Sequence, residues 1–140
     1  MVRKCGVLVC VAVGAFLSGL LVNSGETAEA QEMNRVFELR TYTTLDGELG
    51  ALLERFSGGE TDLFAKHGMR GVGYWVPADA PASENTLVYI LSHESRDAAA
   101  ASWQAFGSDP DWRAMRAASG RLVSNVESLF LNPTDFSPAH

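Results

Sequence analysis

The residues best suited to acid–base chemistry stand in the stretch GSDPDWRAM, residues 107–115. Asp109 and Asp111 flank Pro110, and two carboxylates close together are common in enzymes that move protons. The same three residues are also typical of a helix start: an N-cap, a proline at the first helical position, and an acid in the first turn, where the helix dipole favours negative charge. Residues two apart in a first turn do not face one substrate atom. We therefore interpret the stretch as helix capping.

A second polar group lies in a segment that alternates strictly, residues 35–42, and this alternation predicts a strand. Glu38, Arg40 and Tyr42 share one face with Val36, whereas the other face carries Phe37, Leu39 and Thr41. If the first face lines an enclosed space, it provides an orienting site for a small polar or aromatic ligand. The alternative is a satisfied ion pair at a dimer seam, which fixes register and binds nothing. The candidate lining residues are Glu38, Arg40, Tyr42, Tyr89 and Glu127.

Other catalytic patterns are missing from the sequence. The three histidines, His67, His93 and His140, have no metal-ligand spacing, so no metal or cofactor is predicted. His67 stands where a helix is expected to end, which suits a cation. No Gly-x-Ser-x-Gly elbow or phosphate-binding glycine loop occurs. The residues alone do not decide whether the chain is an enzyme.

The amino terminus has the pattern of an export signal. A basic tip, Arg3 and Lys4, precedes an uncharged and mostly apolar run from residue 5 to 22, and Ala28-Glu29-Ala30 then offers a small-x-small cleavage site. We expect cleavage after Ala30, so that residues 1–30 are the signal and residues 31–140 the domain, in the periplasm or outside the cell. Because the run is nearly long enough to span a bilayer, an uncleaved membrane anchor is the alternative.

Composition narrows the partners of the expected mature chain. Both cysteines, Cys5 and Cys10, lie in the signal, so the domain has no disulfide and no thiolate. From Gln31 onward, Lys and Arg number 9 and Asp and Glu number 15, which leaves a net charge of −6. Such a chain has nothing to attract nucleic acid or an anionic membrane surface.

The elements that would position the candidate residues follow from periodicity. Strands are predicted over residues 35–42, 69–76, 85–92 and 121–131, and the unbroken apolar run 87–91 predicts burial on both faces. A helix follows Asp46 as its cap, has the stripe Leu49, Leu52, Leu53 and Phe56, breaks near Gly58-Gly59 and ends at Gly68. Further helices begin near Ser95 and at Asp109; Gly107-Ser108 stops the former, and Gly120 the latter.

This order predicts an α+β domain of the ferredoxin-like type, βαββαβ, with one antiparallel sheet and helices on one face. In this order we do not expect the first and last strands to be neighbours at the sheet centre, so contact between Glu127 and Glu38 is not required. The helices cover only one face, and the other would present Val36, Tyr42 and half of the 87–91 run to water. We expect a homodimer that closes two sheets face to face.

Four stretches resemble one family in order and position: FELRTY at 37–42, His67-Gly68 before a glycine-rich strand, DPDW at 109–112, and ESLFLNP at 127–133 followed by Phe136-Ser137-Pro138. Together they resemble the NIPSNAP family over residues 36–138. The resemblance implies a dimeric α+β barrel and a family without an agreed reaction. Because relatives in the wider barrel superfamily bind haem, the resemblance also leaves open a haem-binding or metal-binding role for His67 or His93.

Two functional hypotheses follow. The first is an exported dimeric barrel that binds a small molecule or has a structural role, because no catalytic constellation is visible. The second is a small cofactor-independent oxygenase or isomerase that acts on an aromatic or lipid-like compound, because Glu38, Arg40 and Glu127 would place polar groups in a confined space.

Overall fold

The computed structural model describes residues 35–139, and the predicted signal, both cysteines and His140 lie outside this range. Within the described range, no helix is long and apolar enough to cross a membrane. The elements run in the order β1 (Val36–Thr44), α2 (Leu49–Arg55), the π-helical segment η1 (Phe56–Glu60), α3 (Thr61–Lys66), β2 (Arg70–Trp75), the 3-10 turn η2 (Ala82–Glu84), β3 (Thr86–His93), α4 (Arg96–Ser108), α5 (Pro110–Ser119) and β4 (Val123–Leu131).

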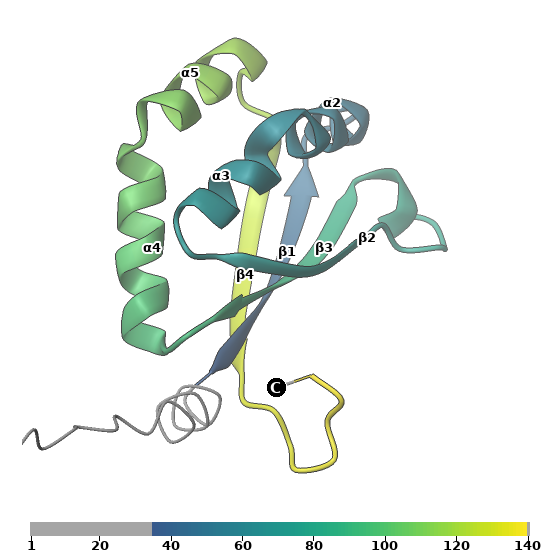
Figure 1. Ribbon diagram of the computed structural model, residues 1–140. Helices are drawn as coiled ribbons and strands as arrows, with labels where there is room; N and C mark the ends of the chain where they lie inside the picture. Colours follow the sequence, from purple (N-terminus) through teal and green to yellow (C-terminus); the bar gives the residue numbers. More distant parts are fainter. Residues whose placement is uncertain (1–34, 140) are drawn as a thin grey trace, which may run out of the picture.

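The fold class predicted from the sequence is confirmed: four antiparallel strands form one sheet, and the helices gather on one side of it (Figure 1). The strand order is β2-β3-β1-β4. The expectation that the first and last strands are not neighbours is wrong, because β4 pairs with β1 along nearly its whole length. Strand β1 therefore lies inside the sheet, with β3 on one side and β4 on the other.

The core lies between the helices and the helix-facing side of the sheet. Leu52 of α2, Phe64 of α3 and Phe106 of α4 pack against the sheet residues Leu87 and Tyr89, and all of these side chains are buried. The aromatic rings meet mostly edge to face, as between Phe56 and Tyr89 at 5.3 Å, which is a favourable geometry for ring pairs. Since the domain has no disulfide, this apolar cluster supplies most of its stability.

Glycines on β2 make room for neighbouring aromatic rings. A side chain at Gly71 would collide with the ring of Tyr74, and one at Gly73 with the ring of Trp75. The register with β3 shifts between these two glycines, which marks a bulge. The sequence pattern indicates close approach of other groups to this backbone, and the approaching groups are rings of the same strand.

Most helix boundaries agree with the sequence. Ser95 caps α4 by accepting a hydrogen bond from the backbone N–H of Ala98, and Gly68 and Gly120 adopt positive φ where α3 and α5 end. The expected cap Asp46 is wrong, because α2 begins two residues later, after Glu48, and lacks a side-chain cap. Helix α4 ends at Ser108, as the sequence predicts from the Gly107-Ser108 pair.

The side of the sheet away from the helices is only partly covered. Trp75 of β2 is 51% exposed and Leu129 of β4 is 58% exposed. Val88 and Ile90, which the apolar run predicts to be buried, are half-buried here. Strand β4 is an edge strand, so its outer backbone groups lack a partner strand within the described chain.

The predicted break in the first helical region is present as a kink. Gly59 has φ of 131° inside the π-helical segment, a conformation that residues with a Cβ rarely adopt. The neighbouring Gly58 has no positive φ, and a Cβ there would meet nothing within 4 Å. The kink places Glu60 beside Arg55, with the Arg55 Nε 2.7 Å from Glu60 Oε2.

We expect Gly59→Ala to lower the free energy of unfolding by about 1 kcal/mol or more, because the new Cβ is strained at this φ and also presses on Met115. Gly58→Ala is the matched control and should be neutral or stabilising by up to about 1 kcal/mol, since alanine favours helix. Urea unfolding of the two variants checks this. Equal destabilisation by both would contradict the role given to Gly59.

Candidate functional site

The polar group predicted on β1 forms a closed network around the Glu38 carboxylate, whose side chain is only 2% exposed. One oxygen, Oε1, accepts hydrogen bonds from Arg40 Nη1 and Ser128 Oγ, each at 2.6 Å. The other, Oε2, accepts from Trp103 Nε1 at 2.7 Å and lies 3.0 Å from His93 Nε2. These partners come from β1, β4, α4 and β3, so the carboxylate joins three strands and a helix.

The network keeps Glu38 ionised in the interior. Burial alone would raise its pKa, but hydrogen bonds from His93, Ser128 and Trp103, together with the charge of Arg40, outweigh burial and lower the pKa to about 2. An ionised carboxylate only accepts hydrogen bonds, so the proton between it and His93 is on Nε2. Arg40 also lies over the Trp103 ring at 4.1 Å, which closes the network further.

This arrangement corrects the predicted location of the pair. We expect Glu38 and Arg40 on the face that a second subunit would cover, but the contact with Trp103 places them under the helices of their own chain. Both oxygens of Glu38 are already occupied by donors from the same chain. The ion-pair alternative therefore describes Glu38 better than the ligand-site hypothesis, although the pair stabilises one subunit and not a dimer seam.

The other three candidate residues, Tyr42, Tyr89 and Glu127, do not lie together in one site. Tyr89 is fully buried in the aromatic core, where burial raises its pKa well above the usual value, and its hydroxyl has no hydrogen-bond partner within residues 35–139. Glu127 pairs with Thr41, so it lies on the opposite face from Glu38 and Arg40 and does not join them. Of the five candidate residues, Tyr42 alone lines the groove described below, and its ring also packs in the core.

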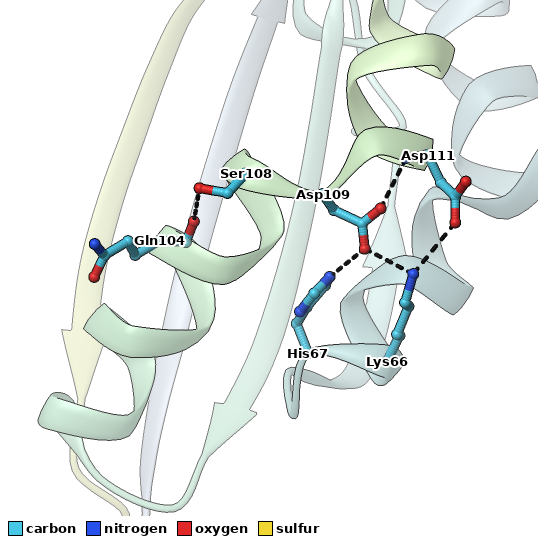
Figure 2. Close-up of polar contacts among 6 residues, drawn as sticks. All are labelled: Lys66, His67, Gln104, Ser108, Asp109 and Asp111. Atoms are coloured by element: carbon cyan, nitrogen blue, oxygen red, sulfur yellow. Dashed lines mark hydrogen bonds and ion pairs between the residues drawn. The ribbon is translucent and has the colours of Figure 1, made fainter.

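The acid pair of the DPDW stretch acts as the sequence suggests. Asp109 accepts a hydrogen bond from the backbone N–H of Asp111 at 2.8 Å and caps α5. Its other oxygen lies 2.6 Å from His67 Nε2 and 2.8 Å from Lys66 Nζ, which fixes the end of α3 to the start of α5 (Figure 2). Lys66 and then His67 hold the pKa of Asp109 well below its usual range.

A His–Asp pair is part of the triad that activates a serine, but within residues 35–139 no hydroxyl is hydrogen-bonded to the His67 ring. The hydroxyl of Ser108 donates to the carbonyl of Gln104 at 2.9 Å and points away from His67 (Figure 2). A nucleophile must contact the base that activates it. The cluster therefore has a structural role. Among residues 35–139, no group of three or more His, Cys, Asp or Glu side chains is placed to hold a metal ion.

An open groove of about 650 Å³ is lined by residues of α2, α5, the end of β1 and the start of β4. Its aromatic surface comes from Tyr42 and Trp112. Its charged surface comes from Arg55, Arg113, Arg116 and Arg121; Ala117, Gly120, Leu122, Val123, Ser124, Asn125 and Val126 complete the lining.

Of the residues that line the groove, the sequence identified only Tyr42 as a candidate. A signal was present: Arg113, Arg116 and Arg121 occur within nine residues of an acidic chain, and the first two are three apart on α5. Residues three apart on a helix share a face. Trp112 and Met115 form an apolar stripe on the same helix and pack against the core. This stripe accounts for the presence of a helix here, so nothing in the sequence required a role for its arginines.

We expect Glu38 to make the domain sensitive to acid. Its folded-state pKa is about 2, against an ordinary value of 4.5. Between these values the unfolded chain binds more protons than the folded one, so the contribution is full above pH 4.5 and is lost as pH falls through about 2. The difference corresponds to stability on the order of 3 kcal/mol.

Glu38→Gln should lower the free energy of unfolding near neutral pH by about 3 kcal/mol, because an amide cannot satisfy all the donors around it. It should also flatten the pH dependence of stability between pH 2 and 4.5. Urea unfolding over a pH series measures both effects. Glu127→Gln, on the opposite face of the sheet, is the control and should change neither. Parallel pH profiles for wild type and Glu38→Gln would contradict this assignment.

Comparison with known proteins agrees with this fold. A NIPSNAP protein of unknown function, Atu4242 from Agrobacterium tumefaciens, superposes with a TM-score of 0.69 at 25% identity, over 77% of this chain and 96% of that one. A NIPSNAP-like domain protein from Burkholderia xenovorans gives 0.68 at 19% identity, over 76% and 90%. SnoaB, a cofactor-independent oxygenase from Streptomyces nogalater, gives 0.50 at 16% identity, over 75% and 98%.

The likenesses to the Burkholderia protein and to SnoaB, at 19% and 16% identity, concern the fold alone. No curated protein matches the chain in sequence. The NIPSNAP family model matches residues 37–138, nearly the whole of the described structure. The chain therefore belongs to the NIPSNAP family.

Proposed function

We propose that this protein binds a small molecule in the groove between α5 and the start of β4. The observation that carries the proposal is the groove itself: about 650 Å³ with aromatic rings, Tyr42 and Trp112, in its lining. Ligand sites in proteins span roughly 300–1,000 Å³ and combine apolar surface with a few polar groups. The interior network around Glu38 serves to hold β1 and β4 in place beneath the groove.

The chemistry of the lining favours binding over turnover. None of the groove residues is a carboxylate or a histidine, and arginine stays protonated at any physiological pH. An isomerase needs a group that accepts a proton from its substrate. The second candidate is thus a cofactor-independent oxygenase that acts on an aromatic or lipid-like compound. Its substrate would have to lose a proton without a base from the protein, and the arginines would then stabilise the resulting anion.

We also propose that the protein is exported and that it forms a homodimer. Export rests on the N-terminal sequence, and an intact mass that retains residues 1–30 in the exporting cell would contradict cleavage.

The dimer is supported by exposed Trp75 and Leu129 on the face away from the helices. A two-fold axis would place this face of one copy against the same face of another. Val126 points to the other side of β4, beside Tyr42, so this dimer leaves the groove open.

Binding in the groove can be tested with N-phenyl-1-naphthylamine, a neutral aromatic probe whose fluorescence rises in apolar surroundings. We expect saturable binding to residues 31–140 and at least a tenfold loss in Ala117→Trp, because the indole fills the groove that Ala117 lines. Ala118→Trp is the matched control, since Ala118 is an exposed neighbour on α5 outside the groove. Thermal unfolding confirms that both variants fold. Equal binding by both variants would remove the groove as the site.

Self-association can be tested by sedimentation velocity at micromolar concentration. We expect a dimer for residues 31–140 and a monomer for Leu129→Glu, because a charge at a buried contact lacks a partner. Val126→Glu is the control: Val126 is also exposed on β4 but faces the groove, so this variant should remain dimeric. A monomeric wild-type protein, or a Leu129→Glu variant that still dimerises, would contradict the proposed interface.

A further inference from the structure

Positive charge is concentrated in the groove of an otherwise acidic protein. The whole chain carries a net charge of −6, with 11 Lys and Arg against 17 Asp and Glu. Four of those basic residues, Arg55, Arg113, Arg116 and Arg121, line this single groove, and no carboxylate does. They come from α2, from α5 and from the segment that enters β4, so the fold, and not one local run of sequence, brings them together.

One of the four arginines is already neutralised. Arg55 donates from Nε to Glu60 Oε2 at 2.7 Å, and both side chains are largely buried. Its guanidinium also lies over the Trp112 ring at 5.1 Å, where it supports the aromatic wall of the groove. Arg55 therefore helps to build the site, and its charge is taken up by Glu60.

The other three arginines carry no such partner. Within residues 35–139, no ion pair joins Arg113, Arg116 or Arg121 to a carboxylate. All three are exposed, so their side chains can turn toward a bound group. The nearest acid along α5, Asp111, is instead paired with Lys66 at 3.2 Å. The groove therefore has a positive rim, formed by Arg113, Arg116 and Arg121, and an aromatic wall, formed by Tyr42 and Trp112.

We propose that the groove recognises an organic anion: a small molecule with an aromatic or other apolar body and one acidic group such as a carboxylate or sulfonate. This inference rests on the proposed function and adds the chemical class of the ligand. The apolar body packs against Trp112, Tyr42 and Val126, and the acidic group accepts hydrogen bonds from the arginines of the rim. The planar fork of a guanidinium suits such an oxygen pair, and charged hydrogen bonds are stronger than neutral ones.

The rim explains how an acidic protein can take up an anion. Like charges elsewhere on the surface repel the ligand only weakly, because salt screens charges beyond about 10 Å. Inside the groove, three unpaired cations act at short range, where screening is smallest. A neutral molecule of the same shape gains only the apolar contacts, so the protein should discriminate between the two.

Two fluorescent probes differ in this one feature. 8-Anilinonaphthalene-1-sulfonate has the ring system of N-phenyl-1-naphthylamine and adds a sulfonate. We expect residues 31–140 to bind the sulfonate probe at least tenfold more tightly than the neutral one, in competition for one site. Raising NaCl from about 20 to about 200 mM should weaken only the sulfonate probe. Ala117→Trp should abolish binding of both.

Variants of the rim give the decisive comparison. Arg113→Gln and Arg116→Gln should each weaken the sulfonate probe about fivefold or more, and the double variant further, while binding of the neutral probe stays constant. Arg116→Lys, which keeps the charge, should lose less than Arg116→Gln. Arg70→Gln is the matched control: Arg70 is exposed on β2 and outside the groove, so this variant should bind both probes as wild type does.

The outcomes separate the two proposals. If both probes bind in the groove with equal affinity, or if Arg70→Gln weakens the sulfonate probe as much as the rim variants do, the anion inference is wrong and the groove function stands. If neither probe is sensitive to Ala117→Trp, the groove function fails and the anion inference fails with it. Thermal unfolding of each variant confirms that losses in binding are not losses of fold.

Discussion

The structure depends on one buried charge. A carboxylate taken out of water is costly unless every lone pair finds a donor, and Glu38 finds its donors on β1, β3, β4 and α4. This requirement restricts register, because a slip of one residue in β4 would turn Ser128 to the other face of the sheet. It also fixes the position of α4, because the indole of Trp103 must reach the carboxylate. Apolar packing provides most of the stability, whereas this network specifies one arrangement of strands and helix.

The groove is a consequence of how the helical layer is divided. Asp109 ends α4 and begins α5, so the chain turns between them, and its links to Lys66 and His67 hold α5 near α3. The kink at Gly59 brings Glu60 to Arg55, which in turn supports Trp112. Polar contacts thus position both the aromatic wall and the basic rim of the groove, and the end of β1 and the start of β4 complete its lining.

Periodicity and capping in the sequence predict the class of fold, the four strands and most helix ends, because these depend on neighbours along the chain. They do not predict which face of β1 the helices cover. Phe37 and Leu39 make one face the more apolar, yet the face with Glu38 and Arg40 is the one beneath the helices, because donors from distant elements satisfy its charges. The same limit applies to Glu127, whose face depends on pairing with Thr41, and to the groove, whose arginines converge only in three dimensions.

The most distant donor to Glu38 is Ser128, which lies 90 residues further along the chain on β4. The Glu38 carboxylate therefore cannot be buried with all of its donors until β4 has been synthesised. Contacts so distant in sequence form slowly and together. A shortened product that ends before β4 would keep this liability permanently, so the domain should resist division into independently folding fragments and should expose its incomplete forms to cellular proteases.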